Sequence, residues 1–277
     1  MSANHRLAEL LRVGTRQRLL GEATEAEQSL REAVAIVEEH FAEDAVKLAA
    51  ALNSLGLVCK DLAKYDEARS LYERALAIVD TNSDANADDI ATLYHNLGGI
   101  EHARRNYTEG EAFARTGIEI RKRLGSSAET ALAADMVALA AILDGQQKFE
   151  EAEPLYLEAL GVLERSPDSN AGEIAVALND LGALYTQRGD SDRAEELLVR
   201  AVDIKSQTIG PRHPDVAVTL NNLAIVHKRR GEIARAKALY QDALGIFEEA
   251  LGADHPKTLA CRRNHDRCAT ELPDSQA

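Results

Sequence analysis

Three residues near the C-terminus have the types and spacing of metal ligands. Cys261, His265 and Cys268 lie at i, i+4 and i+7, so a helix would place them on one face. A structural zinc site needs four ligands in a tetrahedral array, and no fourth ligand is evident in the sequence. The alternative is a terminal helix that buries one or two cysteines. We therefore predict no metal site and no cofactor.

Motifs of catalysis are missing from the sequence. It holds no Gly-x-x-x-x-Gly-Lys-Ser/Thr phosphate loop, no His-Glu-x-x-His zinc helix and no Gly-x-Ser-x-Gly nucleophile elbow. The His213-Pro214 step could suggest a catalytic histidine, but it recurs as His255-Pro256. Repetition at this spacing indicates a structural role in a turn. We predict that the chain is not an enzyme.

The elements that must position these residues repeat every 42 residues. A fixed period of this length indicates stacked supersecondary units, in which each unit packs mainly on its neighbours, rather than one globular core. A leucine followed by a glycine or alanine marks the period without a break: Leu55-Gly56, Leu97-Gly98, Leu139-Ala140, Leu181-Gly182 and Leu223-Ala224.

Apolar periodicity predicts two helices in each unit, helix A and then helix B. In one unit, Leu52, Leu55 and Cys59 form a stripe on helix A, and Ala68 begins the stripe on helix B. Glycines follow many of the helices, where they can take the left-handed conformation. The prediction is an all-α, right-handed solenoid forming one domain over residues 1–277. Its repeats are 4–40, 44–80, 87–124, 128–165, 171–208 and 214–250, and a capping helix follows at 256–270.

Composition limits the partners and the compartment. The net charge of −14 argues against a nucleic-acid backbone or an anionic membrane as the main partner. Three cysteines form no disulfide framework, and the N-terminus lacks the apolar core of a signal peptide. We expect a cytoplasmic protein whose oligomeric state is open, with a monomer favoured.

The large and small residues within a unit resemble the tetratricopeptide repeat (TPR) signature. Helix A of one unit presents Leu181, Gly182 and Tyr185, and helix B presents Ala194 and Leu198. Small residues let two antiparallel helices approach, and large ones fill the space between them. The 42-residue length is similar to that of kinesin light chains. HEAT and armadillo arrays have similar periods but do not match two near-equal helices with this spacing.

The resemblance implies a concave groove lined by one face of the A helices, in which a peptide or partner protein binds. Asparagine recurs on this face, although it is a mediocre helix former. Its amides could bond the backbone of an extended peptide, or they could bond the adjacent helix and fix the stacking. The predicted partner-binding residues are Asn53, Lys60, His95, Asn96, His102, Asp144, Asn179, Asp180, Asn221, Asn222, Ile225 and Lys228.

The expected function is that of a non-catalytic adaptor or scaffold. One alternative is a regulatory sensor whose curvature changes when a peptide binds, and another is a solenoid that assembles with itself. The third repeat departs from the pattern, because Glu101 replaces a Tyr or Leu and glycines stand at positions 110 and 117. We expect its helix at 108–124 to pack less well than the others or to mark a bend.

Overall fold

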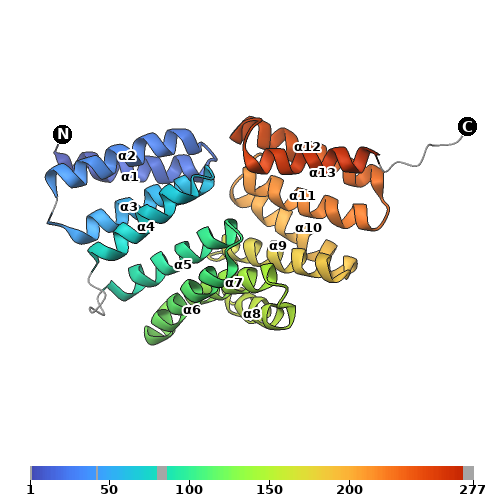
Figure 1. Ribbon diagram of the computed structural model, residues 1–277, viewed down its shortest axis with the longest axis horizontal. Coiled ribbons are helices and arrows are strands. Elements are labelled where there is room, and N and C mark those ends of the chain that lie inside the picture. The colour runs from blue at the N-terminus through green and yellow to red at the C-terminus, as the bar shows by residue number, and fades with distance from the viewer. Residues whose placement is uncertain (1, 42, 80–85, 271–277) are drawn as a thin grey trace, which may run out of the picture. The chain divides into compact units, whose positions relative to one another are not determined.

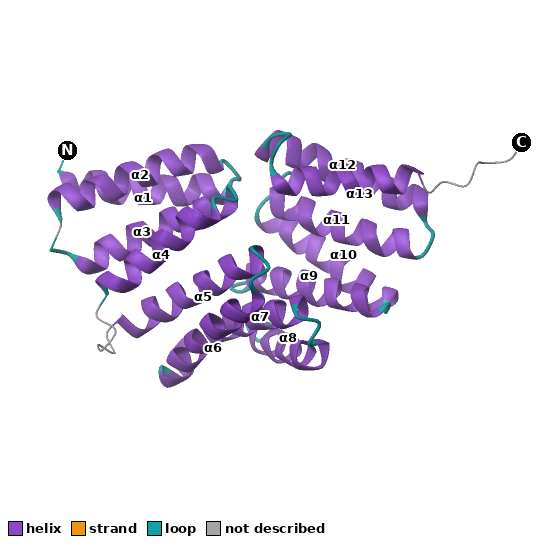
Figure 2. Ribbon diagram, in the orientation of Figure 1, coloured by secondary structure: helices purple, strands orange, loops and turns teal. Residues whose placement is uncertain are grey.

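The computed structural model describes residues 2–41, 43–79 and 86–270, and that part of the chain folds into helices without strands (Figures 1 and 2). The all-α prediction is confirmed. The predicted helix ends agree closely with the observed ones, except that the end expected at Asp80 lies outside the described residues. The A helices are α1 (Ala3–Leu19), α3 (Ala45–Asp61), α5 (Ala87–Ala103), α7 (Glu129–Gly145), α9 (Ala171–Arg188) and α11 (Pro214–Arg229). The B helices are α2 (Ala23–His40), α4 (Tyr65–Ile78), α6 (Tyr107–Arg123), α8 (Phe149–Leu163), α10 (Ser191–Thr208) and α12 (Ile233–Leu251), and a final helix, α13 (Pro256–Thr270), follows.

The chain divides into two compact units. Unit 1 is Met1–Leu155 and unit 2 is Tyr156–Ala277, so the boundary falls inside α8. One continuous domain over residues 1–277 stays a prediction.

Apart from α8, in which the boundary falls, each B helix packs on the A helix before it and on the helix that follows. Unit 1 contains the contacts of α1 with α2, α3 with α4 and α5 with α6, and successive A helices also touch. Unit 2 repeats the arrangement with α9 to α12, and α13 covers α12. Neighbour-to-neighbour packing of helix pairs is the arrangement that the 42-residue period predicts.

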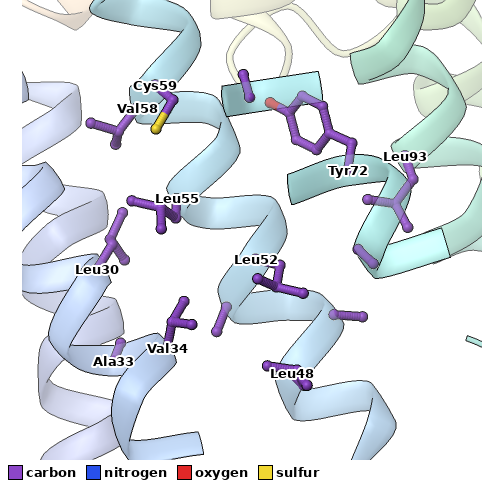
Figure 3. Close-up of a cluster of buried hydrophobic side chains, with 14 of the residues drawn as sticks. Leu30, Ala33, Val34, Leu48, Leu52, Leu55, Val58, Cys59, Tyr72 and Leu93 are labelled. Atoms are coloured by element: carbon purple, nitrogen blue, oxygen red, sulfur yellow. The ribbon is translucent and has the colours of Figure 1, made fainter. Parts of the chain in front are cut away.

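The apolar stripes of the helices meet in the interior of each unit. In unit 1, Leu30 on α2 faces Leu52 and Leu55 on α3, and Tyr72 on α4 lies on the other side of α3 (Figure 3). These four side chains are no more than 2% exposed. Burial of one such side chain contributes roughly 1.5–3 kcal/mol to stability, so helix α3 is held from both sides.

Small residues on the A helices let the B helices come close, as the repeat signature predicts. A Cβ atom on Gly56 would lie 2.5 Å from Cε1 of Tyr72, and a Cβ on Gly182 would lie 2.8 Å from Cγ of Leu198. The two pairs stand at the same positions of their repeats. The aromatic or branched side chain of helix B therefore fills the space that the glycine leaves.

The expectation that the helix at 108–124 packs less well is wrong, and the alternative that it marks a bend stays a prediction. A Cβ added to Gly98 would lie 3.3 Å from the carbonyl oxygen of Gly110, and one added to Gly117 would lie 3.2 Å from that of Ala91. Loss of side-chain volume on α6 is thus matched by a closer approach of α6 to α5. Glu101, which replaces the expected large apolar residue, is fully buried and accepts hydrogen bonds from Arg69 and Asn106 at 2.8 and 2.9 Å.

The turn from helix A to helix B has one backbone conformation throughout the chain. At the same point of each pair a residue has a positive φ of between 59° and 84°. Three pairs place glycine there, which adopts this conformation without strain. The other three place a residue with a side chain, for which a positive φ is unfavourable. The turn keeps this conformation nevertheless, because it sets the angle between the two helices. The six residues are Gly21, Ala63, Arg105, Gln147, Gly189 and Gly231.

Candidate functional site

The recurring asparagines join successive A helices to one another. In unit 1 the side-chain amide of Asn96 on α5 donates to Oδ1 of Asn53 on α3 at 2.7 Å. In unit 2 two bonds of the same kind, each of 3.1 Å, link α9 to α11 and α11 to α13: Asn222 to Asn179 and Asn264 to Asn221. The structure therefore shows the stacking role that the sequence left as one of two alternatives. Asn264 belongs to this set and was not among the predicted residues.

These bonds leave part of each amide for other partners. An asparagine side chain has two N–H donors and an oxygen that accepts twice, and each bond uses one donor and one lone pair. Asn53, Asn221 and Asn222 are half-buried, whereas Asn96 and Asn179 are only 5% and 6% exposed. The half-buried amides are the ones that a ligand could reach.

A buried ion pair takes the place of the asparagine bond between α5 and α7. Arg121 on α6 donates from Nε to Oδ2 of Asp135 on α7 at 2.6 Å, and both side chains are at most 4% exposed. Arg121 also bonds Asp88 and donates to Oγ1 of Thr92 at 3.1 Å. Nδ1 of His95 lies 3.0 Å from Oδ1 of the same Asp135. The predicted site residue His95 is thus fixed to the interior of unit 1.

The other predicted residues of unit 1 lie half-buried on the A helices. Lys60 extends over α5, and a Cβ on Gly99 would lie 2.9 Å from its Nζ. The ring of His102 lies 5.8 Å from that of Tyr107, measured between centroids. Asp144 is half-buried on α7. The space left by the missing side chain of Gly99 is occupied by the lysine.

In unit 2 the predicted residues occupy α9 and α11. Asp180 accepts a 2.8 Å hydrogen bond from Nδ2 of Asn179. Ile225 packs against the buried cluster of α11, α12 and α13, and Lys228 is half-buried on α11. The exposed apolar side chain on this part of the surface is Val176 on α9, with 45% of its area accessible.

A pocket of about 160 Å³ lies between α3 and α5 in unit 1. We call it the α3–α5 pocket, and it includes one predicted site residue, Asn53. Both helices contribute apolar and polar groups to its wall, and Val79 after α4 adds an apolar one. The lining residues are Val46, Ala49, Ala50, Asn53, Ser54, Val79, Asp89, Thr92 and Leu93.

Lys205 on α10 is a buried cation that the sequence analysis did not single out. It is 6% exposed, and its Nζ donates to Oγ1 of Thr219 at 3.0 Å and to the carbonyl oxygen of Asp215 at 3.3 Å. Burial lowers the pKa of Lys205, while the charges of Asp215 and Asp180 act in the opposite direction. The signal in the sequence is a lysine at a position where four other repeats carry valine, leucine or phenylalanine.

We expect Lys205→Met to raise the free energy of unfolding at pH 7 by about 1 kcal/mol, because it removes a buried charge whose bonded partners are neutral. The lowered pKa means that the unfolded chain binds the proton more tightly than the folded one. Stability of the wild type should therefore rise relative to the variant as the pH approaches the ordinary lysine value of about 10.4. Urea midpoints of both proteins at pH 7 and pH 10 measure this, and a pH-independent difference would contradict it.

The candidate metal ligands near the C-terminus face backbone oxygens. The thiols of Cys261 and Cys268 point to the carbonyl oxygens of Tyr240 and Ile233, at 3.6 and 3.9 Å. His265 lies beside Asp266, with Nδ1 3.3 Å from the carboxylate. These contacts agree with a terminal helix that buries its cysteines.

A second group of possible ligands is held by cations. Ligand atoms of Glu27, Cys59 and Glu67 lie within 4.8 Å of one another. However, Lys64 and Arg31 bond the two carboxylates at 2.6–2.7 Å. Burial, with a further effect from the two glutamates, raises the pKa of Cys59 to about 12. A protonated thiol is a poor ligand, so the group is best described as a neutralised ion cluster.

The repeated histidine–proline steps cap helices. Nδ1 of His213 accepts a hydrogen bond from the backbone N–H of Asp215 at 3.1 Å, and Nδ1 of His255 accepts one from Lys257 at 3.2 Å. Each proline follows in the first turn of its helix, where no backbone donor is lost. The structural role predicted for both steps is confirmed.

Comparisons with known proteins agree with the repeat architecture. A family model for the tetratricopeptide repeat matches residues 6–81, 89–165, 173–249 and 215–272. No curated protein matches the chain at a significant level. None of the described helices has both the length and the apolar character needed to span a bilayer.

Several solved structures are similar. BtubC (BKLC) from P. vanneervenii is 25% identical, with a TM-score of 0.58 over 87% of this chain and 93% of that one. NprR in complex with its cognate peptide NprX is 12% identical, with a TM-score of 0.75 over 98% and 74%. Rap protein complexed with Competence and Sporulation Factor is 15% identical, with a TM-score of 0.69 over 98% and 77%. The last two share the fold.

The predicted kinesin-light-chain type of repeat is confirmed by the family match and by the likeness to BtubC. Because the matched segments cover most of the sequence and follow its helix pairs, the chain belongs to the tetratricopeptide repeat family.

Proposed function

We propose that the chain is a non-catalytic interaction module that binds a peptide or a segment of a partner protein on the exposed surface of its A helices. The observation that carries the proposal is the combination of apolar and amide groups on that surface. Val46 on α3 is 51% exposed and Val176 on α9 is 45% exposed, each on the same helix as a paired asparagine. Apolar contacts beside fixed hydrogen-bonding groups are what an extended peptide requires.

Two further points support this function. NprR and Rap, which have the same fold, were each crystallised with a bound partner, in one case a cognate peptide. In addition, the asparagine bonds between successive A helices hold this surface in place before a ligand arrives. A preformed surface loses less conformational entropy on binding than a mobile one.

The test uses two exposed valines of unit 2 as a matched pair. Val176 lies on an A helix and Val199, 42% exposed, lies on the B helix α10. We expect Val176→Glu to reduce recovery of the bound protein at least tenfold, because a charge then replaces an apolar contact, and Val199→Glu to leave it unchanged. Alanine at the paired asparagines would be less informative, since it also removes a bond between helices.

The measurement is affinity purification from lysate of the source organism with wild type and both variants, followed by quantitative mass spectrometry. Circular dichroism of the purified variants must show equal helix content. Equal loss with both variants, or no loss with Val176→Glu, would contradict binding on the A helices.

A further inference from the structure

One position near the end of helix B carries either an apolar side chain or a cation. It recurs every 42 residues and is buried in each repeat. At this point the chain passes from helix B to the next helix A, so the side chain lies against the A helices. The residues are Val37, Val79, Arg121, Leu163, Lys205 and Phe247.

The two cations bond the A helix that follows them, and Arg121 also bonds the A helix that precedes it. Arg121 bonds Asp88 and Thr92 on α5 and Asp135 on α7. Lys205 donates to Thr219 on α11 and to the carbonyl oxygen of Asp215 at its start. Asp135 and Thr219 themselves stand at one equivalent position, 84 residues apart. The fold therefore accepts a positively charged group at this point in two different repeats.

The α3–α5 pocket lies at the equivalent point of the second repeat. Here the side chain is Val79, which is short, and the residue opposite it is Leu93. The pocket of about 160 Å³ that results is close to the 150 Å³ of an engineered cavity that holds a benzene molecule. It is therefore large enough for one unbranched side chain.

Ser54, Asp89 and Thr92 supply hydrogen-bond acceptors to the pocket, and Asn53 adds the N–H donors of its amide. The hydroxyls of Ser54 and Thr92 each donate to a backbone carbonyl at 2.9 Å, so their oxygens can act only as acceptors for a ligand. One lone pair of the Thr92 oxygen already accepts from Arg121 at 3.1 Å. Asp89 adds an exposed carboxylate. Asp89 also stands at the position that Asp215 occupies beside Lys205. Such a lining favours a donor with a positive charge.

We propose that the α3–α5 pocket binds the side chain of a lysine of the partner, with its alkyl chain against Val46, Ala50 and Val79 and its ammonium group on Asp89. The proposal rests on the proposed function, because it names the chemistry of a group that the A helices of unit 1 recognise. A lysine combines an apolar stem with a compact charged end. The bound lysine would stand where Arg121 and Lys205 stand in other repeats.

The experiment is an NMR titration of the isotopically labelled full chain with Nα-acetyl-lysine N-methylamide. We expect the backbone amides of Ala49, Ala50, Asn53 and Thr92 to shift with a dissociation constant in the millimolar range. The norleucine derivative, which has the same stem without the ammonium group, should bind about threefold to fivefold more weakly, as expected for a partly exposed ion pair. Added salt should weaken binding of the lysine probe and leave binding of the norleucine probe unchanged.

Two variants test the pocket itself. Asp89→Asn should reduce the affinity for the lysine probe to that of the norleucine probe. The control is Asp203→Asn, at an exposed aspartate on α10, which should leave the affinities for both probes unchanged. Val79→Lys copies the lysine of the fifth repeat, so we expect the protein's own ammonium group to occupy the pocket and the probe to stop binding. Asp89→Asn alone is sufficient should the second variant not fold.

The corresponding arginine derivative serves as a third probe. Equal affinity for the lysine and norleucine probes, tighter binding of the arginine probe than of the lysine probe, or no shifts at these amides would each overturn the proposal. The two experiments separate its failure from that of the proposed function. If the lysine probe does not bind but Val176→Glu still reduces recovery of the partner, the proposed function stands and the lysine pocket is ruled out. If the probe binds but Val176→Glu has no effect, the pocket stands as a lysine-binding site and the proposed function fails.

Discussion

Arg121→Val should lower the free energy of unfolding by about 3–5 kcal/mol, because it leaves the carboxylate of Asp135 buried without its guanidinium partner. The side chains of both residues are at most 4% exposed, and the bond between them is 2.6 Å long. Asp88, the other carboxylate on Arg121, has 66% of its side chain exposed and would return to water. His95 is the remaining contact of Asp135, at 3.0 Å. Asp135→Leu should cost less, since Arg121 keeps its bonds to Asp88 and Thr92.

The double variant Arg121→Val/Asp135→Leu should lie within about 1.5 kcal/mol of wild type, because an apolar pair can replace a buried ion pair at little cost. The second repeat already carries this apolar pair, since Val79 and Leu93 stand at the equivalent positions one repeat earlier. Urea unfolding followed by circular dichroism at 222 nm measures all four proteins. The midpoints should be compared, because helical repeats can unfold in more than one step.

A double variant as unstable as the sum of the two single ones would show that the ion pair does not act as a unit. A single variant with an unchanged midpoint would show that Asp135 is solvated or neutralised without Arg121. Glu196→Gln, an exposed carboxylate on α10, controls for the loss of one surface charge and should shift the midpoint little.

The repeat period was sufficient to predict the helices, and it also contains the signal for this ion pair. The small and large residues at fixed positions specify which helix faces are buried, so the helix bounds and the A–B pairing follow from the sequence. Arg121 interrupts a series that is apolar in most repeats. A comparison of equivalent positions in the six repeats would have identified both Arg121 and Lys205 as buried cations.

The asparagines show why the candidate site was harder to predict. Their recurrence on one helix face was visible, but the bonds join residues 43 apart, one residue more than the period. That offset depends on the angle between successive A helices, which the spacing of residues does not give. The sequence could therefore name the amides without deciding between a ligand and a neighbouring helix as their partner.

The third repeat illustrates a different limit. Glycines at positions 110 and 117 were expected to weaken the packing of α6, because they remove side-chain volume and lower helix propensity. In the structure the backbones approach instead, so that the lost volume leaves no gap. Volume alone cannot predict this outcome, because the distance between helices adjusts to the residues at the contact.

Gly56→Val should destabilise unit 1 by about 3 kcal/mol, since the new side chain meets Tyr72 in a fully packed interior. Even a Cβ at this position would lie 2.5 Å from Cε1 and 2.8 Å from Cζ of the ring, and the ring is fully buried. Gly56→Ala should cost no more than about 1 kcal/mol, because the better helix propensity of alanine offsets part of the contact. The fourth and sixth repeats already place an alanine opposite a tyrosine at these positions.

The contact can be isolated with a double-mutant cycle. Tyr72→Ala alone should cost about 3–5 kcal/mol through the cavity it creates, but in Gly56→Val/Tyr72→Ala the valine gains the space of the ring. The double variant should therefore be more stable than the sum of the single ones by about 1–3 kcal/mol. Gly245→Val, at an exposed helical glycine with open space around it, controls for propensity and should be neutral or slightly stabilising. The stability of each variant is measured by thermal or urea unfolding. If the losses of the two single variants simply add up in the double variant, the contact with Tyr72 is not what excludes a larger side chain at position 56.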